Sequence, residues 1–138
     1  MAPSADDYLS ITPAELPVPT AHGYLLSSVN PRPIAFATTL SKDGVPNLAP
    51  FSYFNVFATR PATVVFSPNR SGKTGQQKDT ALNLFDTDEV VINTVSYGIV
   101  EQMNLAATAF PPQVNEIEAA GLSTLPSEVV APDAIFDD

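Results

Sequence analysis

The stretch 67–83 gathers most of the side chains in this sequence that could bind an anion. It reads SPNRSGKTGQQKDTALN, so Arg70 lies in a polar loop and Lys78 stands where a helix is expected to begin. The first turn of a helix has free backbone N–H groups and a partial positive charge. Together with Arg70, Lys78 and the Thr80 hydroxyl, such a turn would hold a phosphate monoester. The alternative is a solvated basic loop in which Asp79 only caps the helix.

Two better-known catalytic patterns fail in this sequence. The triplet Gly72-Lys73-Thr74 resembles the end of a P-loop, but that motif needs a glycine five residues earlier, where Ser67 stands, and a helix directly afterwards. A serine hydrolase needs a G-x-S-x-G elbow and a His partner; the elbow is absent and the single His22 lies in a proline-rich segment. With no Cys and one His, no metal site is expected.

Charge is unevenly distributed along the 138 residues, whose formal net charge is −9. All six basic residues lie between Arg32 and Lys78 with one acid, whereas residues 79–138 carry eleven acids and no base. An acidic chain disfavours non-specific binding to nucleic acids and anionic membranes, while a confined basic segment suits a small anion. The apolar runs are too short to cross a bilayer and no secretion signal is visible, so we expect a cytoplasmic protein.

The strands that must position the basic loop follow from alternation and from turn residues. An alternating segment at 34–41, an Asp43-Gly44 turn and an aromatic-rich segment at 45–57 predict an antiparallel hairpin. Pro46 and Pro50 indicate that the second of these strands is an edge strand or is bulged. Further strands are expected at 62–67, at 89–94 and from Val129-Val130.

Short helices are expected between the later strands, at 79–85, 96–107 and 116–120. Asp79 and Ser96 are the expected N-caps of the first two, while Asn115 caps the third and Gly121 stops it. Six prolines among the first 33 residues favour an extended N-terminal arm at 1–31 rather than a helix. Hairpins with short inserted helices indicate an antiparallel barrel or sheet rather than a doubly wound sheet.

Four segments in this order resemble the flavin reductase-like FMN-binding proteins, a split-barrel family that includes flavoredoxin-like flavoproteins. They are PRPIAFATTLS at 31–41 with its Asp-Gly turn, NLAPFSYFN at 47–55, Ser67 with KDTALN at 78–83, and VVIN at 90–93. The resemblance covers about residues 20–133. It implies a mainly β fold with short helices, an antiparallel Greek-key split β-barrel, formed by a single domain over 1–138 that works as a homodimer.

The resemblance also implies which residues hold FMN. The phosphate side matches Ser67, Lys78, Asp79 and Thr80, and the loop that varies within the family adds Arg70 and Lys73. The flavin ring would lie beside one strand, matched by Asn47, Leu48, Ala49, Pro50, Ser52 and Asn55, and a facing strand, matched by Thr38 and Thr39. Because Pro50 interrupts the ladder, we expect residues 47–52 to be irregular and to present backbone N–H groups to the flavin.

The implied activity is that of an oxidoreductase that transfers a hydride from NADH or NADPH to bound FMN. Reduced flavin or electrons would pass on to a partner oxygenase or another acceptor. Two alternatives remain open: an FMN-binding electron-transfer module that reacts poorly with nicotinamide, and a truncated relative that does not hold flavin. The last arises because family members usually continue through several further strands, whereas this chain is expected to be incomplete beyond Pro132-Asp133.

Overall fold

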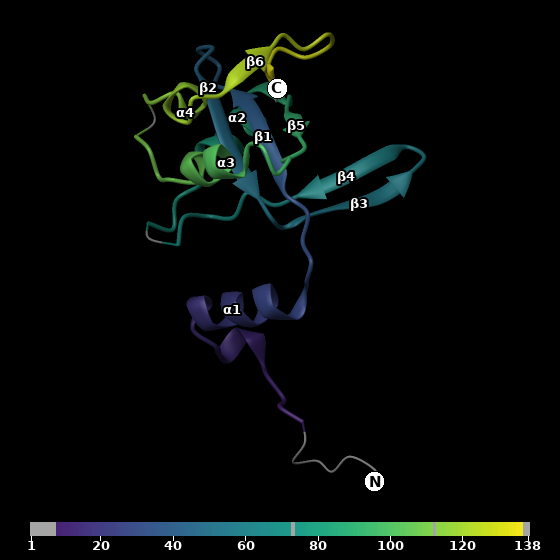
Figure 1. The fold of residues 1–138 in the computed structure, drawn as a ribbon. Helices are drawn as coiled ribbons and strands as arrows, with labels where there is room; N and C mark the ends of the chain where they lie inside the picture. The colour runs from purple at the N-terminus through teal and green to yellow at the C-terminus, as the bar shows by residue number, and fades with distance from the viewer. Residues whose placement is uncertain (1–7, 73, 112, 137–138) are drawn as a thin grey trace. The chain divides into compact units, whose positions relative to one another are not determined.

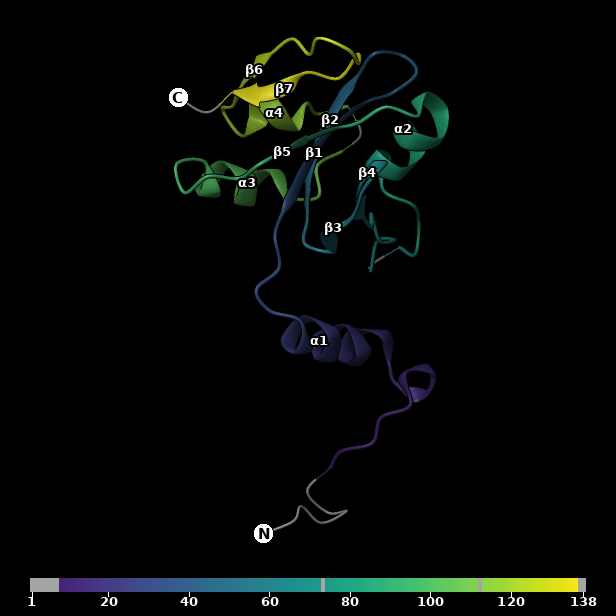
Figure 2. The same ribbon diagram turned by 90° about the vertical axis from the view of Figure 1, so that its right-hand side faces the viewer.

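The computed structural model of the chain describes residues 8–72, 74–111 and 113–136. The chain divides into two compact units, residues 1–31 and residues 32–138. Figure 1 labels α1–α4 and β1–β6, and Figure 2 also labels β7. The second unit contains all the strands of the described part of the chain, together with the helices that pack on them.

The first unit contains a helix where an extended arm is expected. Helix α1 spans Val18–Ser28, so the prediction of extended backbone is wrong there. Two of the prolines that suggested it stand at the start of the helix. Pro17 is the N-cap and Pro19 lies in the first turn, where a missing N–H breaks no helical hydrogen bond. The remaining turns contain no proline, and the Asn30 amide donates to the Leu26 carbonyl oxygen at 3.1 Å beyond their end.

The second unit is built on a three-stranded antiparallel sheet in the order β2-β1-β5. Its strands are β1 (Ala35–Leu40), β2 (Pro46–Phe51) and β5 (Val91–Asn93). The turn between β1 and β2 contains Gly44 with φ of +80°, a conformation that favours glycine, and this confirms the expected hairpin.

Two further antiparallel hairpins complete the strands. The expected strand at 45–57 is two strands, because the chain leaves β2 and forms β3 (Phe54–Thr59), which pairs with β4 (Ala62–Phe66). The last hairpin joins β6 (Ser123–Leu125) to β7 (Ala134–Phe136). The predicted strand at 129–130 is therefore wrong, since that segment is the connection between β6 and β7. The described strands form antiparallel sheets and do not close a barrel.

Strand β2 is regular, which corrects the prediction that residues 47–52 are irregular. Its register with β1 runs from Ala35↔Phe51 to Leu40↔Pro46 without a shift. In an antiparallel pair, successive residues turn their N–H groups alternately toward the partner strand and away from it. The N–H of Leu48 donates to Glu116 and so points away from β1, and Pro46 and Pro50 share that orientation. Both prolines therefore stand where the ladder needs no donor.

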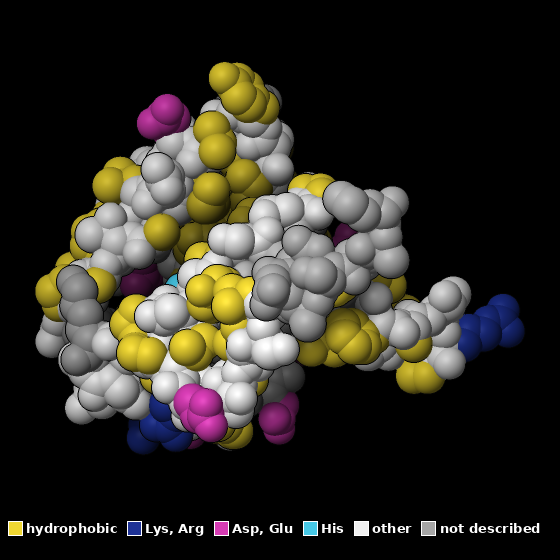
Figure 3. All heavy atoms as spheres, turned by 90° about the horizontal axis from the view of Figure 1, so that it is seen from below, with side chains coloured by type: hydrophobic (Ala, Val, Ile, Leu, Met, Phe, Trp, Pro, Cys, Tyr) yellow, Lys and Arg dark blue, Asp and Glu magenta, His cyan; other side chains and the backbone are white. Residues whose placement is uncertain are grey.

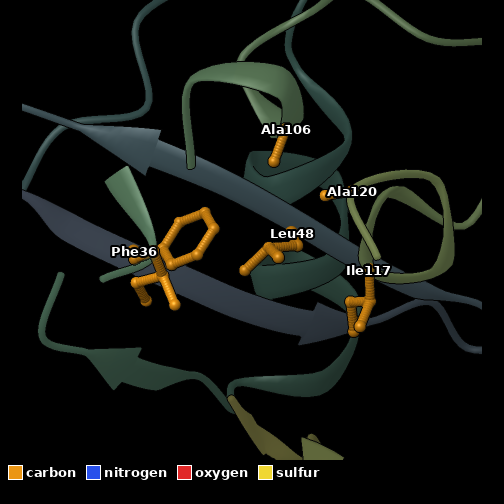
Figure 4. Close-up of a cluster of buried hydrophobic side chains, with 6 residues drawn as sticks. Phe36, Leu48, Ala106, Ile117 and Ala120 are labelled. Atoms are coloured by element: carbon orange, nitrogen blue, oxygen red, sulfur yellow. The ribbon is translucent and has the colours of Figure 1, made fainter. Parts of the chain in front are cut away.

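The two faces of this sheet are buried by different clusters. On one face, Phe36 and Leu48 are fully buried against residues of α3 (Val100–Ala106), of α4 (Glu116–Ala119) and of their flanks, as Figure 4 shows. On the other, Ala35, Ala37 and Phe51 pack with side chains from β3, β4 and β5. Helix α2 (Asp79–Thr87) lies on the side of β1 and β2 opposite α3 and α4 (Figure 2).

The three predicted helices are present, but α3 begins at Val100 rather than at residue 96, and two of the three predicted caps are wrong. The Asn115 side chain accepts a hydrogen bond from the Ile117 N–H at 3.0 Å, and Gly121 has φ of +67°, so this cap and stop are confirmed. Asp79 is the first helical residue of α2, after Lys78 at the N-cap. Ser96 accepts from the Gly98 N–H in a turn that precedes α3 and does not cap it.

The hairpin of β3 and β4 forms a projecting ribbon with apolar side chains in solvent. Figure 3 shows hydrophobic side chains along this ribbon at the right of the view. The most exposed are Val56, at 69%, and Phe57, at 71%, and Val64 and Val65 are about half exposed. Elsewhere among the described residues, no helix has both the length and the apolar character needed to cross a bilayer.

Leu48→Ala tests the placement of that side chain in the core. The substitution is expected to lower the free energy of unfolding of the flavin-free protein by about 2–5 kcal/mol, because it leaves a cavity beside Phe36. Chemical denaturation measures the change. Leu82→Ala, at a position 45% exposed on α2, is the control and should cost about 1 kcal/mol or less. Equal losses in the two variants would contradict the core placement.

Candidate functional site

A hollow of about 410 Å³ lies at the outer edge of β2. Its walls are β2, the loop residues 71, 74, 76 and 77, the helix start at 78–80, the segment 106–110 and Glu116. Seven of the residues predicted to bind the flavin line it: Asn47, Leu48, Ala49, Pro50, Lys78, Asp79 and Thr80. The ring-side strand and the phosphate-side motif, which are about thirty residues apart in sequence, thus meet at one place.

The N-terminus of α2 forms one wall of this hollow. Lys78 is the N-cap, and no side-chain oxygen caps the first turn. The Ala81 N–H donates to the Lys78 carbonyl oxygen at 2.9 Å, which leaves the N–H groups of Asp79 and Thr80 for an anion. The Lys78 ammonium lies 5.6 Å from the centroid of the Phe51 ring, a cation–π contact that holds it beside β2. A helix terminus and a lysine therefore bring positive charge to the same wall.

Four buried polar side chains join this wall to the sheet. The Asn47 amide nitrogen donates to the Thr80 hydroxyl at 2.8 Å and to the Thr39 hydroxyl at 3.1 Å. The Asn83 amide nitrogen also donates to Thr39, at 3.1 Å. All four side chains are buried. Thr39 thus belongs to the support behind the hollow and is not among its lining residues.

Several predicted site residues lie away from the hollow. Thr38 is fully buried on the Phe36 face, where its hydroxyl accepts from the Asn93 amide at 3.0 Å. The Ser52 hydroxyl accepts from Arg32 Nε at 3.3 Å. Asn55 lies on the exposed β3 strand and its side chain accepts from the Val56 N–H at 2.8 Å.

The predicted phosphate ligands in the loop before α2 do not gather at the hollow. The Ser67 hydroxyl donates to the Asn69 side chain at 3.2 Å, and Arg70 donates to the Gly75 carbonyl oxygen at 3.2 Å. Neither Ser67 nor Arg70 lines the hollow. Lys73 lies outside the described residues. Of the basic side chains proposed for the phosphate, Lys78 is the one that the structure brings to the hollow.

Two parts of the hollow were missed from the sequence. The segment 106–110 (AATAF) follows α3, and its small side chains leave room for a ligand near the backbone. Glu116 is buried, and its carboxylate accepts the Leu48 N–H at 3.3 Å. Burial raises the pKa of Glu116, and the nearby charge of Asp79 adds to the rise, while hydrogen bonds from the Glu116 and Leu48 N–H groups oppose it.

Known proteins resemble the chain in sequence and in fold. The model of the flavin reductase like domain matches residues 26–136. An uncharacterized protein from Aquifex aeolicus is 45% identical over 112 residues, which are 80% of this chain and 56% of that protein.

Two solved structures resemble the chain closely. Nitrilotriacetate monooxygenase component B from Bacillus cereus has a TM-score of 0.85 at 37% identity, covering 93% of this chain and 62% of that one. A 2-nitrobenzoate 2-nitroreductase from Pseudomonas fluorescens has a TM-score of 0.79 at 31% identity, covering 94% of this chain and 60% of that one.

The chain belongs to the flavin reductase-like family, and the resemblance read from its four segments is confirmed. It spans 56–62% of the length of the relatives described above. The class of protein defined here is a flavin reductase like domain in which short helices pack on antiparallel sheets.

Glu116→Gln tests the cost of burying this carboxylate. Because the pKa is raised on folding, the folded chain takes up the proton at a higher pH than the unfolded chain, and the wild type gains stability as pH falls through the folded pKa. The glutamine cannot ionise. The free energy of unfolding of the variant minus that of the wild type should therefore be highest at pH values above the folded pKa of Glu116, and it should decline as the pH falls through that pKa.

Melting temperatures of both proteins across the acidic and neutral range measure this difference. Glu118→Gln, on an exposed position of the same short helix, is the matched control. The same pH dependence in both variants would contradict burial of Glu116 as the cause.

Proposed function

We propose that the chain binds FMN in the hollow at β2 and takes part in the reduction of that flavin by NADH or NADPH. One observation carries the proposal: the NLAP segment of β2 lines the same hollow as Lys78, Asp79 and Thr80. One wall supplies a cation and helix N–H groups for a phosphate, and the others supply small and apolar side chains for a flat ring.

Each wall has a separate task in the proposed complex. The phosphate is bound by Lys78, by the first turn of α2 and by the Thr80 hydroxyl. The Asp79 carboxylate would repel the phosphate, so its contribution is to keep Lys78 in place. Ala49, Pro50 and the small residues at 106–110 allow the ring to approach the backbone. FMN, when bound, supplies the two-electron chemistry of hydride transfer, and the protein contributes orientation and electrostatics.

The edge of β2 changes the expected contacts with the ring. The N–H groups of residues 47, 49 and 51 point to β1, and the Leu48 N–H is taken by Glu116. This edge therefore offers carbonyl oxygens rather than N–H groups, so hydrogen bonds between it and a flavin would run from ring N–H groups to backbone oxygens.

We further propose that reduced flavin, or its electrons, passes to a partner protein such as an oxygenase. The support is the likeness to nitrilotriacetate monooxygenase component B, which is one component of a monooxygenase. The cytoplasm is the proposed compartment, because NADH and NADPH are found there. The three sheets are proposed to be parts of a Greek-key split barrel that the described strands leave open.

Absorption spectroscopy tests the proposed activity. Purified protein incubated with FMN should retain a yellow flavin spectrum after gel filtration, and NADH or NADPH added under argon should bleach it. A wild-type protein that binds FMN more tightly than riboflavin would support the phosphate site. Protein that stays colourless contradicts flavin binding. Yellow protein that neither nucleotide bleaches indicates the electron-transfer alternative.

Association into a homodimer is the second expected outcome. A two-stranded ribbon with apolar side chains on both strands is marginal in water, so the exposed Val56, Phe57, Val64 and Val65 need a covering surface. Light scattering at micromolar concentration should give about twice the 14.6 kDa mass of one chain. Phe57→Asp should shift this mass toward one chain, whereas Thr59→Asp on the same ribbon should not. A single-chain mass for the unmodified protein would contradict the dimer.

A further inference from the structure

Asn47 uses both of its amide hydrogens inside the protein. One is donated to the Thr39 hydroxyl on β1 and the other to the Thr80 hydroxyl on α2. An asparagine amide carries two hydrogens, so its nitrogen has nothing further to donate to a ligand. Although Asn47 lines the hollow, its nitrogen acts on Thr39 and Thr80 rather than on what binds there.

The bond from Asn47 determines what the Thr80 hydroxyl can do. A hydroxyl has one hydrogen and two lone pairs, and Asn47 occupies one lone pair at 2.8 Å. Among the described residues the structure records no acceptor for the hydrogen of this hydroxyl. Thr80 lines the hollow although it is only 1% exposed, so a group would have to bind tightly against the wall of α2 to accept this hydrogen.

The position of Asn47 is fixed by the sheet. Asn47 pairs with Thr39 in an unbroken ladder of six residue pairs, and Thr39 also receives a hydrogen bond from Asn83. A shift of the Asn47 side chain would leave a buried amide without a partner, which costs about 1–3 kcal/mol. The amide therefore holds the Thr80 oxygen at a set distance from the edge of β2.

We propose that Asn47 is a positioning residue that commits the Thr80 hydroxyl to act as a donor, and so makes the hollow select a flavin that carries a phosphate. A hydroxyl held in this way favours an acceptor-rich anion, since the hydrogen it presents would be satisfied by a phosphate oxygen. This inference rests on the proposed function, because it assigns the phosphate of FMN to the α2 wall.

The test compares the dissociation constants of FMN and riboflavin for a set of variants. Asn47→Ala should reduce the preference for FMN over riboflavin by roughly three- to tenfold, and Thr80→Val by about tenfold or more, since each loses a hydrogen bond to a charged group or its alignment. Thr80→Ser keeps the hydroxyl and should retain most of the wild-type preference for FMN over riboflavin. Combining Asn47→Ala with Thr80→Val should add little to Thr80→Val alone, because both act through one hydroxyl.

Asn83→Ala is the matched control. The Asn83 side chain belongs to the same buried network, but its recorded hydrogen bond goes to Thr39 and not to Thr80. This variant should therefore melt at a lower temperature with the FMN preference unchanged. Lys78→Ala removes a direct phosphate ligand and should lower the preference for FMN over riboflavin by roughly ten- to hundredfold, which gives the scale for the other variants. If Asn47→Ala does not fold, Asn47→Asp replaces it. The aspartate keeps the shape of the side chain but accepts the hydrogen of the Thr80 hydroxyl, so the preference for FMN should fall. Asn83→Asp is the control for the added charge.

The outcomes separate this inference from the proposed function. A wild type that binds neither flavin, or binds both equally, would defeat the phosphate site and with it the proposed function. A wild type that prefers FMN, with the preference lowered equally by Asn47→Ala and Asn83→Ala, would overturn the positioning role alone. An unchanged preference in Asn47→Ala and Asn47→Asp would overturn it as well.

Discussion

The site depends on one buried hydrogen bond, from the Asn47 amide to the Thr80 hydroxyl at 2.8 Å. It joins two residues that are 33 positions apart in the sequence, one on a strand and one on a helix, and most of the residues between them lie in a hairpin and a polar loop. Both partners are buried, with Asn47 9% and Thr80 1% exposed, so breaking this bond would leave buried polar groups without a partner. The start of α2 is thus held against the sheet, whatever conformation the loop before it takes.

The two-residue period of β2 explains why neighbouring residues have different roles. Asn47, Ala49 and Phe51 face α2 and the β3–β4 side, whereas Leu48 faces α3 and α4. A motif matched as a continuous string, such as NLAP, therefore mixes side chains of both faces. Leu48 reaches the hollow while its side chain belongs to the core, and Asn47 reaches it while its amide serves Thr80.

Local signals in the sequence predicted the local features well. The Asp-Gly turn, the strands at 34–41 and 62–67, the start of α2 and the Asn115 cap each depend on a few adjacent residues. Helix α1 was missed because proline is common both in extended backbone and in the first turn of a helix, and the sequence pattern was interpreted as extended backbone. Glu116 and the segment 106–110 were missed for another reason: they enter the site only through the packing of α3 and α4 on β2, which no short-range pattern encodes.

The outer edge of β2 has a consequence for solubility. A free strand edge with alternating N–H and carbonyl groups can recruit a strand from another molecule and begin aggregation. At this edge Pro46 and Pro50 have no N–H, and the intervening N–H of Leu48 is held by Glu116. An incoming strand would find acceptors without donors and could not build a ladder. The chain can thus leave this edge uncovered for a small molecule without exposing a template for fibre growth.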